Sequence, residues 1–329
     1  YAEIDNITLS GNFSYTSDGR IHLGGIAGTI NQTGTVVKNS TSSLTMNINP
    51  AGSGTPAPVN GGTGQHWIGG FVGLFHNGAG IEKCHNSGNI TVDNVARSGG
   101  QVYAGGISGG SYYGMSSSNY SGYIQDSSYT GNITVSNTGN WTFAAGIAGT
   151  IVGGSSATVN STRIERCFVT GTVSCENTSA GFPYVGGIVA YNYYGALVSQ
   201  CYFTGTVIQK GRALGQYTGC IAGYNSQAAA PTNSRIEDCW SSGKISVTTY
   251  DINNLSGPQL AGATSSRCYV IQIFSDGSYR GATGGDSSCF TIDPTAKPTQ
   301  SEYTSLSWNF TTVWKWDSVS GYPKLQWQN

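Results

Sequence analysis

Short runs of alternating apolar and polar residues recur along the chain, and they predict β-strands. None of these runs has the period of about 3.6 residues that an amphipathic helix needs. Two kinds of segment carry the pattern. The first has the form Gly-Gly-apolar-small-Gly and occupies residues 24–28, 69–73 and 105–109, with variants at 145–149, 186–190 and 219–223. The second has the form apolar-x-x-Cys-aromatic-x-x-Gly-x-apolar and begins at Ile81, Ile124, Ile164, Val198 and Ile236.

The spacing of the second segment defines the repeating unit. Its central residues are separated by 43, 40, 34 and 38 positions, and they are Cys84, Ser127, Cys167, Cys201 and Cys239. Each unit contains about three short strands, which is typical of one turn of a parallel β-solenoid. Equivalent side chains would then stack about 4.8 Å apart. A β-propeller has units of similar length, but it usually needs four strands per blade and a regular blade length, and neither is evident.

We therefore predict an all-β fold, a right-handed parallel β-helix (β-solenoid) of about six irregular turns with a C-terminal cap. The right-handed sense follows the crossover preference of parallel strands. The repeats are expected over residues 1–250, and 251–329 hold degenerate last turns and a Trp-rich cap in the same structural domain. We expect the cap to cover the last turn and so prevent edge-to-edge aggregation. A Gly/Pro/Thr-rich excursion within 29–66 predicts a loop.

Composition narrows the functional class. Glycine accounts for 49 of 329 residues and only 9% of residues are charged, which excludes a coiled coil or helical bundle. With a net charge of −1, the chain lacks the excess of basic residues that is typical of nucleic-acid-binding proteins. No apolar stretch approaches the length of a membrane-spanning helix. Abundant Ser, Thr, Asn and Tyr favour an extracellular surface. Because the chain begins part-way into an expected strand, we expect it to be part of a longer protein.

The repeated segments also resemble a known family. Gly-Gly-Ile-Ala-Gly followed by Cys-aromatic-x-x-Gly-x-Val resembles the GLUG-type repeats of bacterial surface and secreted proteins, and residues 308–325 resemble the closing segment of such proteins. The resemblance covers roughly residues 20–329. It implies a right-handed β-helix at the bacterial cell surface, adhesin-like and often part of a longer chain. Similar repeats accompany some secreted proteases, but the sequence shows no protease motif and the family pattern supplies no catalytic residue.

The eight cysteines are expected to be mainly buried thiols. A repeat position that holds either Cys or Ser is a small, inward position, where Cys behaves as a small apolar residue. Stacked pairs such as Cys167–Cys201 and Cys201–Cys239 lie within disulfide range in such a fold, but parallel Cβ vectors usually lack the torsion. Cys268–Cys289 is the best disulfide candidate. No metal-ligand spacing occurs, so we expect no metal and no cofactor.

Catalytic patterns are weak. Ser108 lies in a formal Gly-x-Ser-x-Gly, but it occupies the place that Ala27 and Ala148 hold in other units, and no strand-turn-helix context is predicted. Glu82, Glu165 and Glu237 share one column, beside a column of alternating charge that includes Asp126 and Arg166. Asp126 with Glu165 could serve acid/base chemistry, whereas a surface ladder of ion pairs is the simpler interpretation. We expect no enzymatic activity.

Tyrosines are the candidate binding residues. Six of them follow the glycine segments, near the edge where insertions gather, and tyrosine offers rigid contact area with a polar tip. The alternative is plain surface packing. A second column of aromatic residues directly follows the cysteines and includes His85, Phe168, Tyr202 and Trp240. We expect the rings of this column to stack between turns. The six binding candidates are Tyr112, Tyr113, Tyr191, Tyr193, Tyr194 and Tyr224.

These observations favour a non-enzymatic extracellular adhesion or interaction module of a bacterial surface protein, which displays a Tyr-rich binding edge on a rigid solenoid. Its partner would be a host or bacterial surface protein or a glycan, without nucleic acid and without membrane insertion. The alternative is a carbohydrate-binding or glycan-cleaving β-helix domain, and a purely structural stalk is a third possibility.

Overall fold

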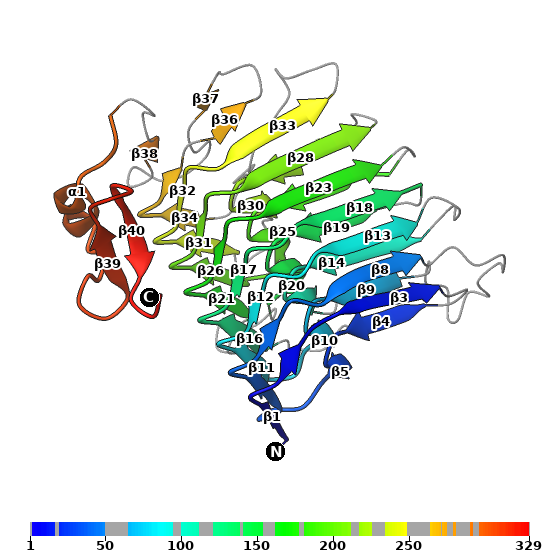
Figure 1. Ribbon diagram of the computed structural model, residues 1–329. Helices are drawn as coiled ribbons and strands as arrows, with labels where there is room; N and C mark the ends of the chain where they lie inside the picture. The colour runs from blue at the N-terminus through cyan, green and yellow to red at the C-terminus, as the bar shows by residue number, and fades with distance from the viewer. Residues whose placement is uncertain are drawn as a thin grey trace.

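The computed structural model shows a parallel β-helix, in which successive turns of chain stack along one axis (Figure 1). It describes residues 2–16, 20–49, 65–94, 100–111, 121–138, 141–153, 162–177, 181–211, 217–225, 234–248, 264–270, 272–274, 279–280, 290–291 and 296–328. The Gly/Pro/Thr-rich stretch at 51–64, on which the loop prediction within 29–66 rests, lies outside these residues, and so do Tyr112, Tyr113 and Cys289.

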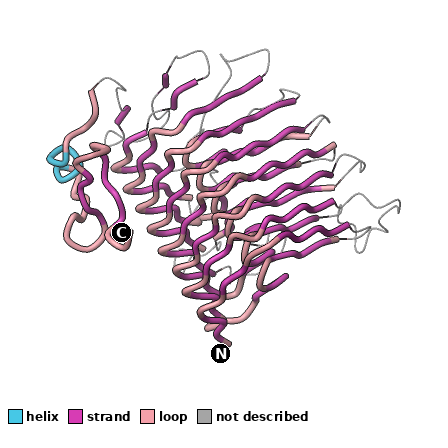
Figure 2. Tube along the Cα trace, viewed as in Figure 1, coloured by secondary structure: helices cyan, strands magenta, loops and turns pink. Residues whose placement is uncertain are grey.

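Each complete turn contributes one strand to each of five sheets, here called A to E (Figure 2). Sheet A contains β1 (Glu3–Asp5), β6 (Val36–Lys38), β11 (Ala79–Glu82), β16 (Gly122–Gln125), β21 (Arg163–Glu165), β26 (Leu197–Ser199), β31 (Arg235–Glu237) and β34 (Thr264–Ser266). Sheet B contains β2 (Thr8–Leu9), β7 (Thr41–Ser42), β12 (His85–Asn86), β17 (Ser128–Tyr129), β22 (Phe168–Val169), β27 (Tyr202–Phe203), β32 (Trp240–Ser241), β35 (Tyr269–Val270) and β38 (Phe290–Thr291). Sheet C contains β3 (Asn12–Thr16), β8 (Thr45–Asn49), β13 (Ile90–Asn94), β18 (Ile133–Asn137), β23 (Thr172–Asn177), β28 (Thr206–Gly211), β33 (Lys244–Thr248), β36 (Gln272–Phe274) and the antiparallel β37 (Tyr279–Arg280).

Sheets D and E meet at the glycine segments. Sheet D contains β4 (Ile21–Gly24), β9 (Gln65–Gly69), β14 (Gln101–Gly105), β19 (Thr142–Ala145), β24 (Pro183–Gly186) and β29 (Tyr217–Gly219). Sheet E contains β5 (Ala27–Ile30), β10 (Val72–Phe75), β15 (Ser108–Ser111), β20 (Ala148–Val152), β25 (Val189–Tyr193) and β30 (Ala222–Asn225). The six strands in each of these sheets match the predicted number of turns.

The structure corrects the expected three strands per turn to five, because two sharp corners divide runs that look continuous in the sequence. One corner, between sheets A and B, places a non-glycine residue at a φ between 48° and 58° in eight successive turns. L-residues rarely adopt this conformation. The residues at this corner are Asn6, Asn39, Lys83, Asp126, Arg166, Gln200, Asp238 and Arg267.

The small residue after each corner stabilises it. The Ser127 hydroxyl donates to the Gln125 carbonyl (2.8 Å) and accepts from the backbone N–H of Cys84 in the preceding turn (3.1 Å). Cys201 behaves alike, since its thiol donates to the Ser199 carbonyl (3.1 Å) and its sulfur accepts from the N–H of Cys167 (3.4 Å). This shared role explains why Cys or Ser occupies the column from Ser40 to Cys268, whereas the first turn has Ile7 there.

Glycine is required at the second corner, between sheets D and E. A Cβ on Gly106 would collide with the Gly146 carbonyl oxygen of the next turn, and a Cβ on Gly187 would collide with that of Cys220. The equivalent residue of the sixth turn is Cys220, which is fully buried. Among the described residues, β29 is the last strand of sheet D, and none follows it to place a carbonyl against this side chain.

The interior is one continuous apolar core between the sheets. Inward residues align in register from turn to turn, as the repeat predicted, and such columns bury apolar surface along the whole axis. The sheet A column consists of Val37, Ile81, Ile124, Ile164, Val198 and Ile236.

The C-terminal segment lies in a different place from the one expected. It contains the short helix α1 (Gln300–Ser305) and the hairpin β39 (Trp314–Asp317) and β40 (Tyr322–Leu325). Its side chains pack on the outer face of sheet B, so the segment runs along the side of the stack (Figure 1). The predicted cap is therefore a lateral clamp, and we use that name for residues 296–328.

Candidate functional site

Two ladders of aromatic rings meet outside the core, where sheets D and E diverge from their shared corner. On sheet D, five rings stack in succession with centroids 3.9 to 4.8 Å apart and nearly parallel planes. They belong to Trp67, Tyr103, Phe143, Tyr184 and Tyr217. Such contacts add to the free energy gained by burial alone.

The last turns open this ladder to solvent. Trp67 is 0% exposed and Tyr184 is 9% exposed, whereas Tyr217 is half-buried. On sheet E, Tyr191 stacks on Tyr224 (5.4 Å, 10°). The two ladders meet edge to face, with Tyr184 on Tyr191 at 5.3 Å and Tyr217 on Tyr224 at 4.8 Å. The four rings therefore form one rigid block.

Two further tyrosines extend the block. Tyr193 stacks on Tyr191 (5.1 Å), and Tyr194 packs edge-on against Tyr193 (3.9 Å). Tyr194 follows β25 in a turn at a φ of 49° and is 36% exposed. Burial raises the pKa of Tyr217, and the neighbouring Tyr224 adds to this effect. We call Tyr184, Tyr191, Tyr193, Tyr194, Tyr217 and Tyr224 the tyrosine block.

The structure thus brings four of the six predicted tyrosines together: Tyr191, Tyr193, Tyr194 and Tyr224. Three of these lie in strands of sheet E, at or near the ends that lead into the variable segments. The sequence analysis missed Tyr184 and Tyr217. A signal was present, because an aromatic residue stands two positions before the first glycine of the segment at Trp67, Tyr103 and Tyr184.

The second aromatic column faces outward on sheet B and lies under the clamp. Phe168 stacks on Tyr202 (5.1 Å), and Tyr202 stacks on Trp240 (4.8 Å), as the sequence predicted. Tyr322 of the clamp covers Trp240 at 4.8 Å. The Trp327 ring lies 5.4 Å from Phe168, and its indole N–H donates to the Arg166 carbonyl (3.2 Å). This column is structural.

The predicted surface ion pairs are present. Arg166 binds both carboxylate oxygens of Asp126 (2.7 and 3.0 Å), and this contact raises the pKa of the Arg166 guanidinium. Glu165 accepts a hydrogen bond from Arg163 instead (2.7 Å). The Tyr123 hydroxyl donates to Glu82 (2.6 Å), and burial raises the Tyr123 pKa to about 12. Asp126 and Glu165 are therefore each held by an arginine of their own.

The cysteine column consists of buried thiols, as predicted. Cys84, Cys167, Cys201 and Cys239 are 0% exposed and none is in a disulfide. Burial raises the pKa of the Cys84 thiol to about 12. The candidate disulfide Cys268–Cys289 involves a residue outside the described part of the chain.

The Gly-x-Ser-x-Gly match at Ser108 lies at an ordinary strand position. Ser108 is fully buried, pairs in register with Val72 and Ala148, and accepts a hydrogen bond from the Gly110 N–H (3.1 Å). Among the described residues, no three His, Cys, Asp or Glu side chains gather as metal ligands do. Within the same residues, no helix has the length and apolar character of a membrane span.

Comparisons with known proteins give a motif match and a similar solved structure. A family model of the GLUG motif matches residues 183–208, which include four residues of the tyrosine block: Tyr184, Tyr191, Tyr193 and Tyr194. Comparison with curated proteins gives no significant match. A solved structure of a putative immunoglobulin A1 protease from Bacteroides ovatus is similar over 92% of each chain, with 14% identity and a TM-score of 0.45. The chain therefore carries a GLUG repeat within a parallel β-helix.

Proposed function

We propose that this chain is a non-enzymatic adhesion or interaction module of an extracellular bacterial surface protein, and that the tyrosine block is its protein-binding surface. The observation that carries the proposal is the crossing of two tyrosine ladders at a partly exposed end of the stack. Tyrosine is enriched at protein interfaces because one side chain offers both apolar area and a polar tip.

The rigidity of the block favours binding. A side chain that becomes ordered in a complex costs about 0.5–1.5 kcal/mol in entropy. The tyrosine rings are already ordered by stacking, so this cost is small for them. The parallel β-helix beneath supplies a stiff scaffold for this surface.

A binding screen with matched variants tests the proposal. The fragment is screened by biolayer interferometry against a panel of purified host and bacterial ectodomains, beside Tyr194→Ala and Tyr193→Ala/Tyr194→Ala. Tyr15→Ala is the matched control, because Tyr15 is 39% exposed and lies on β3, away from the block. We expect the double variant to weaken binding by about tenfold or more and the control to leave it unchanged. Equal binding by the native fragment and both tyrosine-block variants would refute the proposal, and so would absence of binding to every ectodomain.

A further inference from the structure

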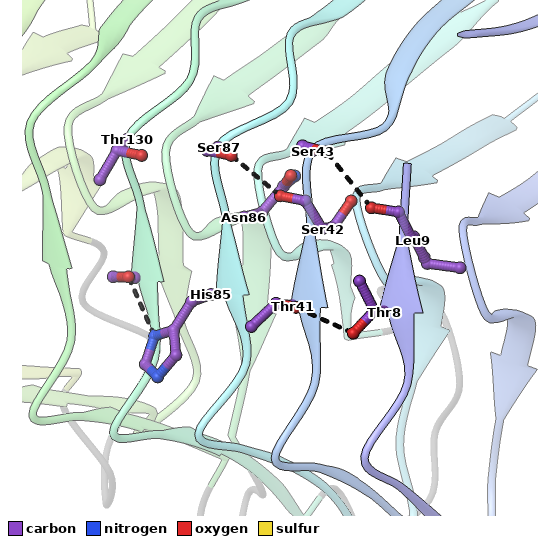
Figure 3. A pocket seen from close by; sticks show the side chains of 10 residues that line it. Thr8, Leu9, Thr41, Ser42, Ser43, His85, Asn86, Ser87 and Thr130 are labelled. Carbon is purple, nitrogen blue, oxygen red and sulfur yellow. Dashed lines mark hydrogen bonds between the residues drawn. The ribbon is translucent and has the colours of Figure 1, made fainter. Parts of the chain in front are cut away.

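A hollow of about 390 Å³ lies on the outer face of sheet B, beyond the end of the clamp (Figure 3). It spans β2, β7, β12 and β17, so it crosses four successive turns. One row of side chains along it contains Thr41, His85 and Ser128, and a second row contains Ser43, Ser87 and Thr130. Figure 3 shows the two rows running in parallel across the strands.

Most of the lining side chains carry hydroxyl groups; the others are Leu9, the Asn86 amide and the His85 imidazole, and none is charged. The Ser87 hydroxyl donates to the Ser42 carbonyl at 3.2 Å, whereas the contacts of the Thr41 and Ser43 hydroxyls are long. Thr41 Oγ1 lies 3.4 Å from Thr8 Oγ1, and Ser43 Oγ lies 3.5 Å from the Leu9 carbonyl. Each hydroxyl has one donor and two acceptor positions. The hollow can therefore donate to and accept from a ligand that is itself rich in hydroxyl groups, whereas an anion would find no compensating cation.

An aromatic ring lies against His85, one of the residues that line the hollow. Trp327 stacks on His85 with ring centroids 5.1 Å apart, and the indole is half-buried. The other imidazole edge is held by Ser128 Oγ, which lies 3.0 Å from His85 Nδ1. An apolar ring face beside hydroxyl groups suits a sugar ring, which has apolar C–H faces and a polar rim.

The spacing of the lining also fits an extended chain. Neighbouring parallel strands are about 4.8 Å apart, so the hollow repeats its hydroxyl groups at that step. This step is close to the length of one sugar residue in an extended oligosaccharide. We propose that the hollow binds a linear, neutral oligosaccharide along the helix axis, with one ring beside His85 and Trp327 and with hydroxyl groups of the following residues bound by Thr41 and Ser87.

This site is separate from the tyrosine block, so either proposal can fail alone. The test is isothermal titration of the whole fragment with cello-, manno-, xylo- and chito-oligosaccharides, and with oligogalacturonate as the anionic probe. Thr41→Arg fills the hollow from an exposed position. Thr204→Arg is the matched control, because Thr204 is equally exposed and continues the Ser87 row beyond the hollow.

We expect at least one neutral oligosaccharide to bind the native fragment, and Thr41→Arg to weaken that binding by about tenfold or more. Thr204→Arg and Tyr194→Ala should bind as the native fragment does. Absence of binding to all neutral probes, preference for oligogalacturonate, or equal binding by Thr41→Arg would each overturn the proposal.

Discussion

The indole of Trp327 stacks on the imidazole of His85, with ring centroids 5.1 Å apart. This contact joins the end of the clamp to the third turn of the β-helix. It fixes the clamp along the side of the stack, and it forms the border between the covered and the open parts of the sheet B face. One contact thus links the stability of the clamp to the shape of the hollow.

Removal of the Trp327 ring should destabilise the clamp. Trp327→Ala removes the stacking on His85 and Phe168 and the hydrogen bond to the Arg166 carbonyl. We expect the free energy of unfolding to fall by about 2 kcal/mol, since the indole is only half-buried. Urea denaturation measures the change. Val319→Ala in the same segment is the control, because Val319 is 94% exposed and should change little.

The glycine corner makes a position-dependent prediction. Gly187→Ala should destabilise the fold by about 3 kcal/mol or more, because its Cβ would collide with the Cys220 carbonyl oxygen and with the Phe203 ring. Cys220→Ala, at the equivalent position in the sixth turn, should cost about 1–2 kcal/mol through the lost sulfur alone. Thermal unfolding of both variants compares them. A smaller effect at Gly187 than at Cys220 would contradict this account of the corner.

The cysteine column should accept Ser more readily than Val. The Cys201 sulfur accepts from the Cys167 N–H and donates to the Ser199 carbonyl, and a serine hydroxyl serves both roles in the turn of Ser127. Cys201→Val removes the hydrogen-bonding partner of these two buried backbone groups. This loss should lower the free energy of unfolding by about 1–3 kcal/mol. We therefore expect Cys201→Val to lower the free energy of unfolding more than Cys201→Ser, measured by urea denaturation.

The buried thiols should be unreactive in the native state. Burial raises the pKa of Cys84 and of Cys220 to about 12, so almost no thiolate is present at neutral pH. Titration with Ellman's reagent should label these residues only after denaturation, as mass spectrometry of the peptides would show. Rapid labelling of Cys84 in the folded protein would contradict the structure.

Acidification should destabilise the protein through its histidines. Burial lowers the pKa of His85, against an opposing effect of Asp126, and burial also lowers the pKa of His22 and His76. When folding lowers the pKa of a histidine, the unfolded state binds more protons than the folded state at acidic pH. The histidine therefore contributes its full stabilisation of the folded state only above 6.5, its pKa in the unfolded state. Stability should therefore fall as the pH drops below that value.

His85→Gln tests the contribution of one residue. Glutamine keeps a hydrogen-bonding group beside Ser128 but does not titrate, so the free energy of unfolding should depend less steeply on pH just below 6.5. The clamp carboxylate Asp317 provides a contrast, since its pKa is lowered to about 2 by Lys324 and Ser320 and its effect appears only in stronger acid. An unchanged slope in His85→Gln would refute the role of His85.

Much of the fold was predictable because every turn places the same kinds of side chain at equivalent positions. The columns of Ile81 and of Cys84 could be aligned from the sequence, since an inward position accepts only a narrow set of side chains in each turn. The number of strands per turn was not predictable. The corner at Lys83 uses a left-handed conformation with a long polar residue, which gives no glycine signal in the sequence.

The candidate sites were predictable only in part. Tyr191 and Tyr224 were identified because they follow the glycine segments, and their stacking confirms that they are neighbours. Tyr184 and Tyr217 were missed, although they stand just before those segments. The hollow around Thr41 gave no sequence signal, because threonine and serine are common throughout this chain.

The sequence by itself determined the β-helix, its register and the inward or outward direction of most side chains, because repeated units with alternating side chains allow one mutual alignment that buries all the apolar columns. The tertiary structure alone decided where the clamp lies, which rings it covers and where the sheet B face remains open. These features depend on the contact of Trp327 with His85, and the residues of the clamp share no repeat with the turns on which they pack.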